Sequence, residues 1–124
     1  MLDDMGIYSS KLSDSAQRVV DRAIEEVKRK EHILLEIEHL CLAFVQVEWD
    51  FFVAVMKDNN VDPFLITNAL EDHLHQLPIS TSWKHDIKTS PATKLLLELA
   101  IVTAGRDGRP QVESWDLFCA FLEQ

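Results

Sequence analysis

The chain has 124 residues, of which 47% are hydrophobic and 27% charged, as expected of an ordinary folded protein and not of a disordered segment. Its 12 basic and 21 acidic residues give a net charge of −9. This balance disfavours nucleic acid and anionic membranes as partners, because affinity for phosphate groups comes largely from Lys and Arg. Only three Gly and four Pro leave little room for the turns of an all-β fold.

The beginning of the chain shows no targeting segment. The first ten residues, MLDDMGIYSS, are acidic at the start and lack the apolar centre of a signal peptide. No apolar run elsewhere approaches the roughly 20 residues that are needed to span a bilayer. We therefore expect a cytoplasmic protein.

Helical periodicity begins at Ser13. Apolar residues recur at helical spacing over 13–30 and charged residues lie mostly opposite, which predicts an amphipathic helix with Ser13 or Asp14 as its cap. The next helix, 37–47, is apolar nearly all round, so we expect it in the middle of the fold.

Two further helices are predicted over about 50–57 and 63–77. The turn-forming pair Asn59-Asn60 separates them, and Pro63 suits the first turn of the second. The residues of helix 63–77 that we expect to face the core are Phe64, Ala69, Leu70, Leu74 and Leu77.

Residues 78–90 interrupt the periodic pattern. This stretch is polar and rich in Ser and Thr, with one tryptophan, Trp83, and we interpret it as a linker. Ser90 followed by a proline then opens a fifth helix to about residue 104, and a sixth helix runs from 114 to 124. The chain is therefore predicted to be all-α.

The second half of the chain repeats the first at a spacing of 77 positions, which is the separation of Ser13 from Ser90. The segment 36–45, EIEHLCLAFV, returns as ESWDLFCAFL at 113–122, with Glu, Leu, Ala and Phe at the same places. The register holds without a gap across a helix, a loop and a second helix. We therefore expect two copies of one helical unit, each burying its apolar face against the other about a pseudo-twofold axis.

One domain over 1–124 is the predicted organisation. Its first four-helix repeat spans about 12–77, the linker 78–90, and the second, partial repeat 90–124. Counterparts of the third and fourth helices would lie beyond Gln124, so the second repeat is expected to be truncated. The apolar surface that those helices would cover predicts self-association.

An ordered set of motifs gives the chain a family resemblance. The helix opening S-x-x-AQRV at Ser13 is followed by EHLCLAF at 38–44, VMKDNNVDP at 55–63 and SPATKLLLELA at 90–100. Together with the internal repeat, this order resembles the N-terminal double repeat of the Clp ATP-dependent unfoldases. The resemblance covers about residues 10–124.

The resemblance implies a docking domain that is flexibly tethered ahead of a ring-forming ATPase. Such a domain binds adaptor proteins or substrate segments and has no catalysis of its own, so its expected partners are these proteins and the ATPase ring of its parent chain. No GxxxxGK[ST] phosphate-binding loop occurs in the sequence, which therefore does not encode nucleotide hydrolysis.

The resemblance also implies candidate binding residues. In some members of the family each repeat binds phosphorylated arginine, with a Glu on the guanidinium and a hydroxyl residue on the phosphate. These roles map onto Ser13 and Glu38 in the first repeat and onto Ser90 and Trp115 in the second. Trp115 has no carboxylate, so a family-like pocket is expected in the first half only. With the neighbouring His39, the candidates for adaptor or substrate binding are Ser13, Glu38, His39 and Ser90.

A structural role is an alternative explanation for each of these candidates. Ser13 and Ser90 are explained equally by helix capping, and Glu38 by a solvated carboxylate that interacts with the helix dipole. His39 is compatible with a hydrogen-bonded structural histidine near the start of a helix.

No metal, cofactor or catalytic group is expected. His73 and His75 are two positions apart and face different sides of a helix, and Glu71 and His75 lack a third ligand nearby in sequence. Cys41 and Cys119 both lie in apolar runs, which predicts buried free thiols and not nucleophiles.

Two functional alternatives remain. The first is the docking domain of an unfoldase; the second is a standalone regulatory or scaffolding protein that self-associates or competes for adaptors. A coding frame that continues past Gln124 into an ATPase would favour the first. Among the aromatic residues, Phe51 and Phe52 are expected in the core, and Trp83 is the expected exposed contact for a partner.

Overall fold

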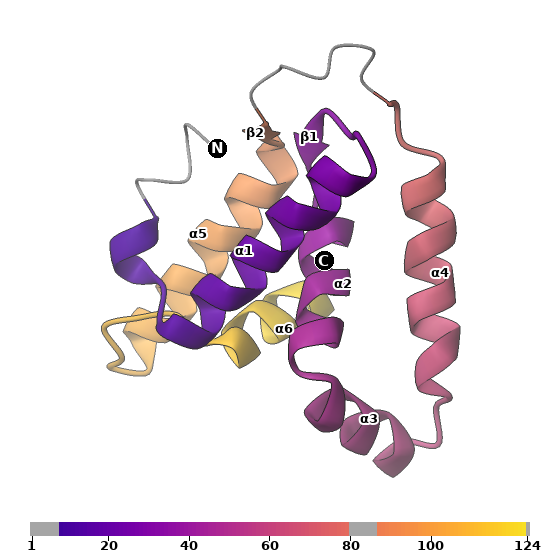
Figure 1. The fold of residues 1–124 in the computed structure, drawn as a ribbon. Helices are drawn as coiled ribbons and strands as arrows, with labels where there is room; N and C mark the ends of the chain where they lie inside the picture. Colours follow the sequence, from indigo (N-terminus) through magenta and orange to yellow (C-terminus); the bar gives the residue numbers. More distant parts are fainter. Residues whose placement is uncertain (1–7, 80–86, 124) are drawn as a thin grey trace.

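The computed structural model describes residues 8–79 and 87–123, and six α-helices account for most of them (Figure 1). The elements in chain order are a 3-10 helix at Ser9–Lys11, α1 Asp14–Arg29, β1 Leu34–Leu35, α2 Ile37–Val47, α3 Trp49–Asp58, α4 Pro63–His75, β2 Lys88–Thr89, α5 Pro91–Arg106 and α6 Ser114–Leu122. The predicted all-α class is confirmed, with two strands of two residues each added to it. Helix α4 ends at His75, two residues before the predicted end.

Within the described ranges, no single helix is long and apolar enough to cross a membrane. Helices α2 and α3 together meet that length and composition, but they are bent by 94° at their junction.

The two repeats are joined by strand pairing that follows the 77-residue shift. Leu35 of β1 pairs in parallel with Thr89 of β2, and an isolated parallel bridge pairs Leu12 with Val112. Adding 77 to Leu12 gives Thr89, and adding 77 to Leu35 gives Val112. The two pairings are therefore the same contact made twice, once in each direction between the repeats.

This pairing holds the first helix of each repeat in place. The Ser13 N–H donates to the Val112 carbonyl at 2.8 Å, and the Ser90 N–H donates to the Leu35 carbonyl at 3.1 Å. Each serine is also the N-cap of its helix, α1 or α5. The start of each first helix is therefore anchored on the segment that precedes the second helix of the other repeat.

Both first helices also end in the same way. Glu31 and Gly108, which are 77 positions apart, have positive φ angles of 57° and 75°. A left-handed residue just after a helix lets the chain turn back, and glycine adopts this conformation with the least strain. The second repeat has the favourable glycine at this position, whereas the first repeat has a glutamate.

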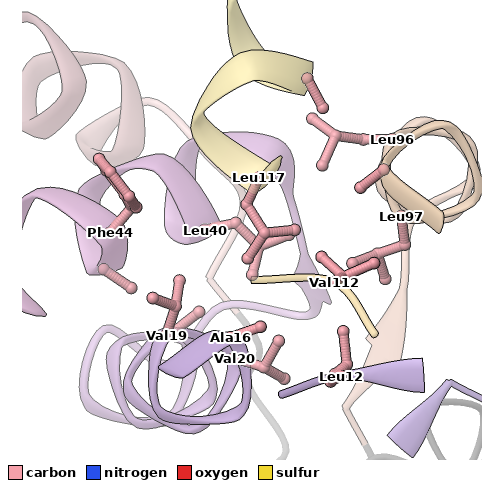
Figure 2. Packing of buried hydrophobic residues seen from close by; sticks show 14 of the residues in the cluster. Leu12, Ala16, Val19, Val20, Leu40, Phe44, Leu96, Leu97, Val112 and Leu117 are labelled. Atoms are coloured by element: carbon pink, nitrogen blue, oxygen red, sulfur yellow. The ribbon is translucent and has the colours of Figure 1, made fainter. Parts of the chain in front are cut away.

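Equivalent positions of the two repeats supply the core between α1, α2, α5 and α6 (Figure 2). Helix α1 packs on α2 as α5 packs on α6, and α6 contacts both α1 and α2. Pairs of buried residues related by the shift are Val19 and Leu96, Val20 and Leu97, and Leu40 and Leu117. The pseudo-twofold duplicated fold is thus present in the packing as well as in the sequence.

Helix α4 lies to one side of this core, beside α2 (Figure 1). Of the residues expected to face the core, Leu74 is buried, and Leu70 and Leu77 are half-buried. Phe64 and Ala69 are exposed, so that part of the prediction is wrong. The reason is that α4 packs mainly on α2 and α3, which leave much of its surface exposed.

Of the other predictions about side chains, some are confirmed and some are wrong. Cys41 and Cys119 are free thiols, but Cys41 is only half-buried and Cys119 is exposed, so the prediction of a buried pair is wrong. Phe52 is buried as predicted, whereas Phe51 is exposed. Trp83 and most of the predicted linker, 80–86, lie outside the described residues.

The duplicated core predicts that the same substitution at equivalent buried positions of the two repeats destabilises the protein to a similar extent. We expect Leu40→Ala and Leu117→Ala each to lower the free energy of unfolding by about 2–5 kcal/mol, because each leaves a cavity at an equivalent buried position. Urea unfolding followed by circular dichroism measures both. Leu95→Ala, on an exposed position of α5, is the control and should change stability by less than about 0.5 kcal/mol. A Leu117→Ala protein as stable as the control would contradict the shared core.

Candidate functional site

Two of the candidate residues, Ser13 and Ser90, are nearly buried and serve the fold. Ser13 Oγ accepts a hydrogen bond from the Ala16 N–H at 3.2 Å, and Ser90 Oγ accepts one from the Thr93 N–H at 3.2 Å. The Thr93 hydroxyl lies 2.8 Å from Ser90 Oγ and donates to the Leu35 carbonyl at 2.9 Å. Capping, the structural role, is therefore present at both serines, and a role in binding stays a prediction.

Glu38 is half-buried at the start of α2, on the side of that helix that faces α4. One of its carboxylate oxygens lies 3.0 Å from His73 Nε2 of α4. Of the four candidates, Glu38 has the most accessible side chain, because Ser13, His39 and Ser90 are all buried. A ligand that used Glu38 would compete with His73 for the carboxylate.

His39 is fully buried, and its hydrogen bonds determine which of its nitrogens carries the proton. Its Nδ1 accepts the backbone N–H of Glu36 at 2.9 Å, while the Glu36 side chain caps α2 in return. Because Nδ1 is an acceptor, the proton of the neutral ring is on Nε2, which lies 2.8 Å from His32 Nδ1 and donates to it. His39 therefore has the burial and hydrogen bonds of a structural histidine, and a role in binding stays a prediction.

In the second repeat, an ion pair takes the place of these two histidines. Arg109 and Asp116 lie 77 positions after His32 and His39. Asp116 accepts the backbone N–H of Glu113 at 2.8 Å, and Arg109 Nη2 lies 2.7 Å from Asp116 Oδ1. The same buried capping arrangement thus uses a neutral pair in one repeat and a charge-assisted pair in the other. The exchange of His39 for Asp116 is a change of internal partner and not of an exposed surface.

Burial alters the protonation of the histidine pair. The pKa of His39 falls from 6.5 to about 4. Burial is the larger cause of this shift, and the nearby His32 contributes to it. Burial also lowers the pKa of His32, with a contribution from the positive charge of Lys30. Burial and the nearby positive groups both disfavour the protonated ring, so both histidines are neutral near pH 7.

Charged groups of α1 and α4 surround the pair. Glu26 is buried, and although burial alone would raise its pKa, the hydrogen bond and charge of Arg29 hold the pKa below its usual value. Lys30 lies 3.0 Å from Glu71 of α4, and it also faces Glu26 at 3.5 Å. His75 faces His32 from α4 and disfavours its charged form. The region is therefore an internally paired polar cluster.

Residues 8–79 and 87–123 contain no group of three or more His, Cys, Asp or Glu side chains that is placed to hold a metal ion.

The two thiols lie in different environments. Burial, together with the charge of Glu38, raises the pKa of Cys41 to about 11, which disfavours the thiolate. Cys119 is exposed and lines a groove on another face.

This groove was not predicted from the sequence. It has a volume of about 420 Å³ and lies between α6 and the junction of α2 with α3. The residues that line it are Phe44, Glu48, Phe51, Ser114, Trp115, Phe118, Cys119 and Leu122. The repeat contains part of the signal, because it aligns Trp115 of the groove with Glu38, whose carboxylate pairs with His73 of α4.

A family model for the Clp repeat (R) N-terminal domain matches residues 11–124. The chain belongs to this family. Two curated relatives of this Clp N-domain chain are chaperone proteins named ClpB, from Chlamydia pneumoniae and Chlamydia muridarum, which are 30% and 29% identical to it over 111 residues. Each match covers 90% of this chain but only 13% of the relative. The chain thus spans about an eighth of the length of those chaperones.

Solved structures of Clp N-domains share the fold. The N-terminal domain of Hsp104 from Candida albicans has a TM-score of 0.83 at 18% identity, covering 91% of this chain and 74% of that one. The N-terminal domain of the ClpV1 ATPase from E. coli EAEC has a TM-score of 0.82 at 18% identity, covering 98% of this chain and 76% of that one. At such identity these similarities show the fold alone.

The histidine pair predicts a loss of stability in acid. Because the folded protein holds the His39 pKa near 4 and the unfolded chain has the ordinary value of 6.5, the unfolded chain binds the proton first as the pH falls. Stability should be unaffected by this group above pH 6.5, fall between pH 6.5 and 4, and level off below. The loss from His39 is about 3 kcal/mol at most.

Urea unfolding at a series of pH values measures this loss. His39→Gln removes one titrating ring and should reduce the dependence between pH 6.5 and 4, whatever it does to stability at pH 7; the part due to His32 remains. His73→Gln, at an exposed histidine, should retain the dependence. An unchanged pH dependence in the His39→Gln protein would show that this histidine is not its source.

Proposed function

We propose that this chain is a docking domain of a Clp-type ATP-dependent protein unfoldase, where it receives adaptor proteins or substrate segments and performs no catalysis. The observation that carries the proposal is the family match over residues 11–124. The relatives devote 13% of their length to the matched region, so the larger part of such a chaperone lies outside it. A cytoplasmic location remains a prediction of the sequence.

The arrangement of the fold supports a binding role. Cross-pairing joins the two repeats into one fold, because each first helix begins with a hydrogen bond to the other repeat. The described polar clusters are internally paired, as in His32 with His39 and Arg109 with Asp116, and these pairs serve helix capping. The accessible apolar groove beside α6 offers a surface for a partner.

Recognition of phosphorylated arginine is a narrower form of this proposal. Its residues in the first repeat would be Ser13 and Glu38, of which Glu38 has the more accessible side chain. In the second repeat, Trp115 stands at the position of Glu38 and offers a ring in place of a carboxylate. Binding of free phosphoarginine that is lost in a Glu38→Gln protein would support it.

A chimeric chaperone tests the proposed function. In it, this chain replaces the N-terminal region of the Chlamydia pneumoniae ClpB to which it aligns. We compare the chimera with the same ClpB lacking that region, measuring the ATP-dependent unfolding of a panel of labelled proteins that differ in net charge. We expect the chimera to process a different subset from the truncated protein, because the docked domain selects substrates before the ring engages them.

Equal ATP hydrolysis by the two proteins controls for an intact ring, and a cooperative unfolding transition controls for a folded domain. A chimera that hydrolyses ATP normally, carries a folded domain and processes the same substrates at the same rates as the truncated chaperone would contradict the proposal.

A further inference from the structure

The outward face of α5 carries an exposed apolar stripe. Leu95 is 67% exposed and Val102 is 50% exposed, and Leu99 between them is half-buried. Their i, i+4 and i+7 spacing places the three side chains in one line along the helix. On the opposite side of α5, Leu96 and Leu97 face the core (Figure 2). Helix α5 is thus apolar on both sides, which is typical of a helix that is covered on both sides.

The first repeat shows whether a third and fourth helix would cover this face. The equivalent positions of α1, 77 residues earlier, are Arg18, Arg22 and Glu25. Arg18 is exposed, and the side chains of Arg22 and Glu25 are 41% and 66% exposed. These residues are exposed in a repeat that has both α3 and α4. By the repeat, counterparts of those two helices would therefore leave the stripe on α5 exposed as well.

The two repeats differ in what they place on this face. In α1, Arg22 Nη1 lies 3.1 Å from Glu25 Oε2, and Arg22 Nε donates to Gln46 Oε1 at 2.8 Å. Such polar contacts suit a solvated helix surface. In α5, Leu99 and Val102 stand at the positions of Arg22 and Glu25. A line of apolar side chains on an exposed face, at positions that the sister helix fills with charges, indicates contact with another molecule.

Basic side chains border the stripe in a chain that is otherwise acidic. Residues 88–106 contain three basic residues and one acidic residue, a charge of +2, whereas the whole chain carries −9. Lys88 and Arg106, at the two ends of the stripe, are exposed. The acidic residue, Glu98, accepts a hydrogen bond from the Tyr8 hydroxyl at 3.4 Å. An acidic partner is therefore attracted to this face.

The same charges disfavour a second copy of the chain on this face. A symmetric dimer would place the same surface of both chains in contact, so Lys88, Lys94 and Arg106 would all be present twice at one interface and repel. Helix α5 has 16 residues and spans about 24 Å, a length along which a second helix can lie. An amphipathic helix with acidic residues beside its apolar side matches both the stripe and its basic border.

We propose that the outward face of α5 is a docking site for an acidic amphipathic α-helix of a partner protein. The helix packs its apolar side chains on Leu95, Leu99 and Val102 and places carboxylates near Lys88 and Arg106. This assignment rests on the proposed docking function and gives it a surface and a class of partner.

The affinity of the chain for designed peptides tests the assignment. The probe is a fluorescein-labelled Leu/Glu amphipathic peptide of about 16 residues, the length of α5. Its controls are a Leu/Lys peptide of the same pattern and a Leu/Glu peptide scrambled to remove the apolar side. Fluorescence anisotropy measures all three at about 0.15 M salt, where long-range charge is screened. We expect the Leu/Glu peptide to bind at least about tenfold more tightly than either control, although the net charge of −9 alone favours the Leu/Lys peptide.

Three variants locate the site, and circular dichroism confirms that each is folded. Leu95→Glu places a charge in the stripe and should weaken binding of the Leu/Glu peptide at least about tenfold. Leu65→Glu, at a similarly exposed leucine of α4, adds the same charge and should leave binding unchanged. Arg106→Gln should weaken binding by about threefold, and this loss should shrink as the salt concentration rises.

Four outcomes would overturn the assignment. In the first, the Leu/Glu peptide binds no more tightly than its controls, and in the second, Leu65→Glu weakens binding as much as Leu95→Glu. In the third, analytical ultracentrifugation detects a dimer that Leu95→Glu dissociates, which would assign the face to a second copy. In the fourth, the peptide binds only to a chain that lacks residues 1–7, which would assign the face to a segment of the chain itself.

The chimeric chaperone separates this inference from the proposed function. We expect Leu95→Glu, and not Leu65→Glu, to change which substrates the chimera processes. If the chimera selects substrates but Leu95→Glu leaves that selection unaltered, the docking function stands and this face is not its site. If the Leu/Glu peptide binds as expected but the chimera selects nothing, the helix site stands and the proposed function fails.

Discussion

The reciprocal pairing between the repeats is the contact on which the rest of the structure depends. Leu12 pairs with Val112 and Leu35 with Thr89, so the repeats are joined by one equivalent pairing in each direction. The amide that precedes each first helix donates to the opposite repeat, so each repeat helps to anchor the first helix of the other. The buried leucines and valines of four helices then pack around one pseudo-twofold axis (Figure 2).

The two repeats share a core but differ in the side chains that surround it. Within the described residues the two repeats share α1 with α5 and α2 with α6, but α3 and α4 have no counterpart there. Helix α4 packs against α2, and residues of α6 line the groove that lies beside the junction of α2 with α3. Internal differences such as His39 against Asp116 leave the shared capping geometry intact, so the two halves tolerate a change of buried polar partner within one common fold.

The fold could be predicted from the sequence to a large extent, because amphipathic periodicity, serine caps and the 77-residue shift each point to paired helices. The short strands could not, since Lys88-Thr89 sits in a polar stretch without strand periodicity and pairs only through the opposite repeat. Periodicity also misplaced Phe64, because it identifies an apolar stripe but not whether another element covers it. The burial of His39 and its hydrogen bond to His32 depend on the tertiary fold, so a one-dimensional pattern had no means of separating it from the more accessible Glu38.

Native-state hydrogen exchange at two amides tests the interlocked fold most directly. The Ser13 N–H is bound to Val112 and the Ser90 N–H to Leu35, one in each direction between the repeats. If the repeats fold as one unit, both amides exchange with the same opening free energy, equal to that of global unfolding in urea. A Ser90 amide that exchanges at a much lower opening free energy than that of Ser13 would show that the second repeat opens alone, and it would contradict the account.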